Sequence, residues 1–183
     1  MKAMGTTTTT LMTFEEFERL DDGPEEIELL KGELIKMPPP QRRHMEICER
    51  LYKLLDAALE RSRKPDGAAG KVHIEMGYLF PGDPSSWLSP DVSVTHAGQA
   101  GQRYYEGAPL IVFEVVSEYD TARHLESKVA QYLAHGASEV WVIHPEMRYA
   151  WRYQGSTQAA TRETKAIRSS LLPDIEIPLD DIL

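Results

Sequence analysis

The sequence is poor in cysteine, since its 183 residues include only Cys48. A single cysteine cannot form an internal disulfide. Cys48 also falls within an amphipathic helical pattern, where a free thiol normally behaves as a small core hydrophobe. We therefore expect a cytoplasmic protein that works in a reducing compartment.

Long apolar segments are also missing. No window approaches the roughly eighteen apolar residues of a membrane span, and the amino-terminal segment lacks the apolar region of a secretory signal. We expect a soluble protein with no membrane partner. The threonine run at residues 6–10 offers nothing to pack, so residues 1–12 are predicted to be a flexible tail. With 42% hydrophobic and 27% charged residues, residues 13–183 are predicted to form one domain.

Positive charge is scarce, because 20 Lys and Arg face 29 Asp and Glu, which gives a formal net charge of −9. Affinity for nucleic acid grows with the number of phosphates neutralised, so binding through a generally basic surface is disfavoured. A polyanionic substrate would have to meet a local basic patch. Residues 41–64, with seven basic and four acidic side chains, are one candidate, although such a mixed segment is more commonly a solvated helix face.

The first half of the chain contains three local signals. Thr13 and Glu16 form a capping-box pattern that predicts a short helix. Apolar and polar residues alternate on both sides of Lys31-Gly32, which predicts a β-hairpin. Apolar residues at helical spacing predict a long helix from Gln41 to about Arg63.

The second half alternates between strands and one helix. Glycine, proline and polar clusters predict a turn at 81–86 and a flexible loop at 97–109. A helix is predicted at 121–136, ended by Gly136, while the proline-broken segment 169–183 is expected to pack down without a long element. Strands are predicted at 71–80, 87–96, 110–116, 139–145 and 149–154. This order predicts an α/β or α+β fold with a central mixed sheet flanked by helices.

Glu114 stands out because it lies in the middle of the apolar run "LIVFEVV". In a strand, it would share one face with Val112 and Val116, while Phe113 and Val115 would point to the other face. A nearly continuous apolar strand is normally covered on both faces. An unpaired carboxylate there would cost several kcal/mol, so Glu114 must find a metal ion, a cation or a proton.

Two further residues can complete a site around Glu114. Asp91 follows Pro90 at the entry of another predicted strand, and two carboxylates at strand ends with a nearby backbone carbonyl suit Mg²⁺. Lys128 lies at the border of the apolar face of the predicted helix, from which its ammonium can lean back towards the sheet.

Taken together, "PD" at 90–91, "EVV" at 114–116 and Lys128 resemble the PD-(D/E)XK nuclease superfamily, in the variant whose lysine has moved from the strand to the following helix. Val116 then occupies the usual lysine position. More narrowly, the chain resembles the Uma-type family of putative restriction endonucleases. The matching segments are "IELLKGELIKMPPP" with His44, "SPDVSV", "LIVFEVVS", "KVAQYLAHGASEVWVIHP" and "LLPDIEIPLDDIL".

This resemblance implies a restriction-endonuclease-like fold in a protein that is often dimeric. It also implies an enzyme that hydrolyses phosphodiester bonds of nucleic acid, with DNA as the expected substrate. Asp91, Glu114 and the carbonyl of Val115 would hold Mg²⁺ or Mn²⁺, and Lys128 would orient water or neutralise charge on the phosphate. Glu28 and His44 are accessory candidates by the same resemblance. The chain departs from the family pattern at Ser117-Glu118-Tyr119, at His124 and at Lys31.

Plainer interpretations exist for each residue. Glu114 and Lys128 can form a purely structural ion pair, Asp91 can be an ordinary residue at a proline turn, and His44 can be a satisfied interior histidine. Two alternative functions follow: a binding or regulatory module that keeps the nuclease scaffold without cleavage, and a hydrolase of another phosphate ester. Zinc spacings and the "GxSxG" elbow are absent, which disfavours a zinc enzyme or a serine nucleophile.

Overall fold

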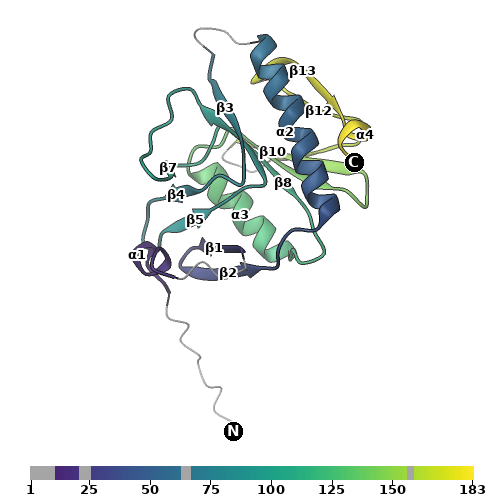
Figure 1. Cartoon of the computed structure of the whole chain (residues 1–183). Coiled ribbons are helices and arrows are strands. Elements are labelled where there is room, and N and C mark those ends of the chain that lie inside the picture. The colour runs from purple at the N-terminus through teal and green to yellow at the C-terminus, as the bar shows by residue number, and fades with distance from the viewer. Residues whose placement is uncertain (1–10, 21–25, 63–66, 156–158) are drawn as a thin grey trace.

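The computed structural model describes residues 11–20, 26–62, 67–155 and 159–183, and most of the described strands belong to two sheets (Figure 1). The five-stranded sheet has the order β2-β1-β5-β4-β7 and the six-stranded sheet the order β11-β10-β9-β8-β6-β3. Strands β8 and β9 run parallel and the other pairs of the larger sheet are antiparallel, so it is a mixed sheet.

The strands of the smaller sheet are β1 (Glu26–Leu30), β2 (Glu33–Met37), β4 (Tyr78–Phe80), β5 (Ser86–Leu88) and β7 (Tyr105–Glu106). Those of the larger sheet are β3 (Ala69–Ile74), β6 (Val92–His96), β8 (Ile111–Val115), β9 (Glu139–His144), β10 (Tyr149–Gln154) and β11 (Ala159–Glu163). A separate two-stranded sheet pairs β12 (Ala166–Ser169) with β13 (Leu172–Pro178). The helices are α1 (Phe14–Phe17), α2 (Arg42–Ser62), α3 (Ala122–Ala134) and α4 (Leu179–Ile182).

Both long helices bury the face that their apolar spacing predicts. On one side of the larger sheet, α2 packs with the C-terminal β13 and α4 against Phe113, Val115 and Trp141. On the other side, α3 packs Val129 and Tyr132 against Val112 and against residues of the smaller sheet. Strand β8 is therefore covered on both faces, as its apolar sequence predicts. Among the described residues, no helix combines the length and apolarity that crossing a bilayer requires.

The predicted hairpin is confirmed and is firmly attached to the smaller sheet. Both turn residues have positive φ, 51° at Lys31 and 77° at Gly32, as a two-residue type I′ turn requires. The backbone N–H of Lys31 donates to the Ser86 hydroxyl at 2.8 Å, and that of Gly32 donates to the Ser85 carbonyl at 3.1 Å. These contacts fix the strand that carries Glu28.

The predicted capping box is confirmed at the start of α1. The Thr13 capping box is present, with the Thr13 hydroxyl accepting from the Glu16 N–H and the Glu16 carboxylate accepting from the Thr13 N–H. Residues 1–10 of the predicted tail lie outside the described residues. Met12 donates its N–H to the Gly32 carbonyl at 2.8 Å. The division into a tail and one domain over 13–183 stays a prediction.

The predicted single strands at 71–80 and 87–96 are wrong in one respect, because each breaks in the middle and changes sheet. Strands β3 and β6 pair in the larger sheet, whereas β4 and β5 pair in the smaller one. The break falls at Glu75, whose φ is 47°, and opposite it at Asp91, whose carbonyl accepts the Glu75 N–H at 3.2 Å. The same long hairpin thus joins both sheets, and Asp91 sits where it bends.

Two other predictions also need correction. The predicted loop at 97–109 contains the short strand β7, which pairs in parallel with β4. The segment 169–183 contains the seven-residue strand β13 despite Pro173. Its partner β12 and the strand β11 carry no strong apolar alternation, which is why the sequence pattern does not reveal them.

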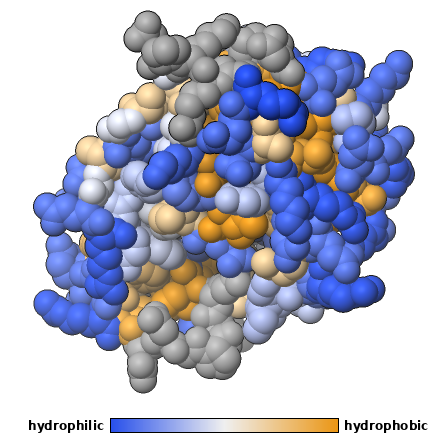
Figure 2. Space-filling model, turned by 45° about the horizontal axis from the view of Figure 1, so that its top comes forward, coloured by the Kyte–Doolittle hydropathy of each residue, from blue (hydrophilic) through white to orange (hydrophobic). Residues whose placement is uncertain are grey.

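The outer surface is mainly hydrophilic on the face shown in Figure 2, where hydrophobic residues form smaller, separate areas. This distribution agrees with a chain in which 27% of the residues are charged.

Close to the bend at Glu75, Gly77 is a position at which a larger side chain should destabilise the fold. A Cβ added to Gly77 would lie 2.4 Å from Cζ2 of the Trp87 ring, so Gly77→Ala should displace that ring and lower the free energy of unfolding by about 1–3 kcal/mol. The matched control is Gly82→Ala, whose Cβ meets only the Pro84 carbonyl at 3.4 Å. Urea unfolding of both variants checks this, and equal stabilities would contradict it.

Candidate metal-dependent nuclease site

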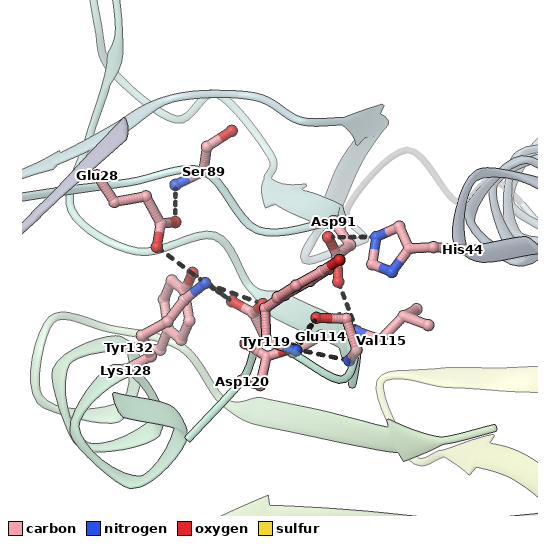
Figure 3. Close-up of polar contacts among 11 residues, drawn as sticks. Glu28, His44, Ser89, Asp91, Glu114, Val115, Tyr119, Asp120, Lys128 and Tyr132 are labelled. Atoms are coloured by element: carbon pink, nitrogen blue, oxygen red, sulfur yellow. Dashed lines mark hydrogen bonds and ion pairs between the residues drawn. The ribbon is translucent and has the colours of Figure 1, made fainter. Parts of the chain in front are cut away.

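The bend between the sheets opens onto a cleft of about 660 Å³. Its floor includes Glu28, Asp91, Glu114 and Lys128, which come from β1, the bend before β6, β8 and α3. Its rim includes Arg43, Glu118, Tyr119, Glu146 and Met147. The three residues that the sequence singles out first, Asp91, Glu114 and Lys128, therefore lie close together in the lining of one cleft (Figure 3).

Glu114 lies on the face of β8 that α3 covers, and its side chain is buried. Its Oε1 accepts a hydrogen bond from the Tyr132 hydroxyl at 2.7 Å and lies 2.9 Å from Nζ of Lys128. Lys128 and Tyr132 are four residues apart on α3, so both project from one helix face. Two side chains of α3 thus contact the Glu114 carboxyl group.

Lys128 is placed between two carboxylates. Its Nζ lies 3.1 Å from Oε2 of Glu28, in addition to its contact with Glu114, and all three side chains are at least 93% buried. Oε1 of Glu28 accepts the backbone N–H of Ser89 at 2.9 Å. The accessory candidate Glu28 therefore reaches the same cluster from the smaller sheet.

Asp91 is held against the end of β8. Its Oδ2 accepts the backbone N–H of Val115 at 2.5 Å, and its Oδ1 lies 3.0 Å from Nε2 of His44. His44 is in the first turn of α2, so the other accessory candidate also contacts the site. Val116, at the usual lysine position, is instead half-buried against the α3 side of the core.

The cluster carries more negative than positive charge, because three carboxylates meet one ammonium and one histidine. Burial raises the pKa of Glu114, Lys128 lowers it and the neighbouring Asp91 and Glu28 carboxylates raise it, so that the resulting pKa is about 8. Burial alone would lower the pKa of Lys128, but the attraction of Glu114 and Glu28 prevails and raises it. The hydrogen bond to Asp91 raises the pKa of His44.

The oxygen atoms of Asp91 and Glu114 suit a hard divalent cation. A carboxylate has about four lone-pair positions, so Asp91 and Glu114 keep acceptor capacity beyond the contacts described above. Carboxylate and carbonyl oxygens are the ligands that Mg²⁺ and Mn²⁺ prefer. Burial, and after it the neighbouring carboxylates, raise the pKa of Glu114, and a bound cation would oppose both by stabilising the ionised form.

Some site residues are not evident from sequence reasoning. Tyr132 reads as an apolar-face residue of α3, and the role of its hydroxyl as a donor to Glu114 is seen only in the fold. Its spacing of four from Lys128 is the signal that could have found it. The segment after β8 also contributes, since the Asp120 carboxylate accepts both the N–H and the hydroxyl of Ser117 at 2.8 Å.

Comparison with known proteins identifies the family of the chain. A family model, Uma2, described as "Putative restriction endonuclease", matches residues 14–180. The chain belongs to the Uma2 family. Among curated proteins, none matches it.

A solved structure shares the fold of this Uma2 chain: the crystal structure of a putative nuclease belonging to DUF820 from Anabaena variabilis ATCC 29413. The TM-score is 0.78 at 20% sequence identity, over 93% of this chain and 97% of the other. The predicted restriction-endonuclease-like fold is confirmed.

A pH dependence follows from Glu114 in this Uma2 chain. Its pKa in the folded protein, about 8, lies above the ordinary value of 4.5, so folding favours the protonated form. The resulting stabilisation is complete below pH 4.5 and is lost as the pH rises through about 8.

In chelator, the wild type should therefore lose stability relative to Glu114→Gln between pH 6 and 8, by at most about 1.4 kcal/mol per pH unit. Urea unfolding at several pH values measures this difference. Glu126→Gln, on the exposed face of α3, is the matched control and should follow the wild type. A wild type that gains stability relative to Glu114→Gln over this range would contradict the prediction.

The Tyr132 hydroxyl gives a second prediction. Tyr132→Phe removes one donor from a buried carboxylate, so it should lower the free energy of unfolding by about 1–3 kcal/mol. Tyr119→Phe is the control, because the Tyr119 side chain is exposed and its change should stay within about 0.5 kcal/mol. Equal effects of the two substitutions in urea unfolding would argue against this role of Tyr132.

Proposed function

We propose that this protein is a metal-dependent nuclease that hydrolyses phosphodiester bonds of nucleic acid, with DNA as the expected substrate. The observation that carries the proposal is the convergence of Asp91, Glu114 and Lys128 on the floor of one cleft. Membership of the Uma2 family supports it.

Asp91, Glu114 and the backbone carbonyl of Val115 would hold Mg²⁺ or Mn²⁺. Such an ion, when bound, polarises the scissile phosphate and lowers the pKa of a water molecule. Two contacts prepare the protein ligands: His44 fixes Asp91 from α2, and Tyr132 fixes Glu114 from α3. Ligands held in this way need little rearrangement to bind the ion.

Lys128 is the cationic group of the proposed reaction. Glu28 and Glu114 keep its ammonium charged and in place, and an ammonium has three N–H donors. In this position it orients the attacking water or offsets negative charge that develops on the phosphate. Glu28 acts through Lys128 and is a positioning residue.

The charge of the cleft restricts how a substrate can bind. Seven acidic residues line it, whereas its basic side chains are Arg43 and Lys128 together with two histidines. Arg43 is paired at 2.5 Å with Glu146, which also lines the cleft. Nucleic acid would therefore depend on bound cations to approach. This acidity also favours a second candidate function, the hydrolysis of a smaller phosphate ester, which needs fewer phosphate contacts.

Oligomeric state and cellular location complete the proposal. By family resemblance we propose a homodimer, which light scattering on the purified protein tests directly. The single cysteine, Cys48, is buried, which supports activity in a reducing cytoplasm.

The test is cleavage of single-stranded, duplex and branched DNA and of RNA, each with Mg²⁺, with Mn²⁺ and with chelator. Cleavage should require the metal and should fall about 100-fold or more in Glu114→Gln and in Lys128→Met, because each removes a group that acts on the transition state. The matched controls are Glu126→Gln and Lys53→Met, since both side chains lie on exposed helix faces.

Cleavage that persists in Glu114→Gln and Lys128→Met would mean that another site or a contaminant cuts. Binding without cleavage would replace the proposal with a silent nuclease-fold module. Activity restricted to small phosphate esters would favour the second candidate function.

A further inference from the structure

Cys48 is a buried thiol that the proposed hydrolysis does not use. It is the chain's only cysteine and is 1% exposed. It lies on α2 four residues after His44, so the two side chains project from the same face of the helix. This face points towards Asp91, which His44 contacts directly.

The three side chains form a compact set of metal ligands. A ring nitrogen of His44, Sγ of Cys48 and a carboxylate oxygen of Asp91 all lie within 4.8 Å of one another. His44 and Asp91 also line the cleft, so a fourth position can be filled by water. Three protein ligands and one open position are the arrangement of tetrahedral Zn²⁺ sites that exchange a ligand.

These ligands differ chemically from those of the proposed Mg²⁺ site, where Asp91, Glu114 and the Val115 carbonyl offer only oxygen atoms. Nitrogen and thiolate ligands favour transition metals such as Zn²⁺, whereas Mg²⁺ requires oxygen. Asp91 takes part in both sets through different oxygens, because Oδ1 lies towards His44 and Oδ2 lies against Val115 at the end of β8.

The surroundings of the thiol favour a cation. Asp91, Glu75 and Glu114 place negative charge around Cys48, and Asp120 adds negative charge around His44. A cation that binds here would displace the thiol proton and the proton held between His44 and Asp91, and both would pass to solvent.

We propose that His44, Cys48 and Asp91 form a second metal site, one that binds a thiophilic divalent transition-metal ion such as Zn²⁺. The site itself is independent of the proposed function. Competition between this second metal ion and Mg²⁺ for Asp91 does rest on the proposed function, because it requires that Asp91, Glu114 and the Val115 carbonyl bind Mg²⁺.

Co²⁺ is the probe, because thiolate coordination to Co²⁺ produces a near-ultraviolet charge-transfer band. Metal-free full-length protein titrated with Co²⁺ should develop this band with a stoichiometry of about one ion per chain, and Zn²⁺ should abolish it. Since the chain contains no other cysteine, the band can arise only from Cys48. Excess Mg²⁺ should weaken the band.

Cys48→Ala and His44→Ala should lose the band, whereas the matched control His144→Ala, which changes another histidine of the cleft, should retain it. Absence of the band in folded wild-type protein at saturating Co²⁺ would overturn the proposal, as would its retention in His44→Ala. A band that Mg²⁺ does not affect would overturn the sharing of Asp91. A band in a protein without nuclease activity would leave this site standing and remove the proposed function.

Discussion

The ion pairs of Lys128 with Glu28 and Glu114 are the interaction on which the site depends. The Lys128 ammonium and two carboxyl groups have left water together, and the buried ammonium is stable only while these partners remain, because an unpaired buried charge is costly. The same contacts join β1 of the smaller sheet, β8 of the larger sheet and α3 between them. A buried polar cluster therefore connects the two sheets through α3.

Asp91 is the second constraint, and its position explains why the shared hairpin bends. Pro90 lacks an N–H donor, so the chain can leave the smaller sheet there before β6 begins in the larger one. The carboxylate that follows is then free to accept the N–H of Val115 at the end of β8. The dipeptide Pro90-Asp91 thus produces both the bend of the hairpin and a candidate metal ligand.

Much of this fold could be predicted because its signals are local. The capping box at Thr13, the turn at Lys31-Gly32 and the apolar periodicity of α2 and α3 each depend on residues within a few positions of one another. The change of sheet at Glu75 could not be predicted in this way, because it depends on which distant strand each half of the hairpin meets. The convergence of Asp91, Glu114 and Lys128 was expected from family resemblance and from the cost of burying Glu114. Their distances and the contribution of Tyr132 required the fold.

The positions of the cluster residues along the chain have a consequence for biosynthesis. Glu28 lies near the start of the chain and Lys128 about two-thirds of the way along it, so the network closes a long loop and cannot form before α3 has been synthesised. A ribosome-bound chain that still lacks α3 has neither the ammonium nor the hydroxyl that hold Glu114. The buried cluster can therefore be completed only after about two-thirds of the chain has been synthesised.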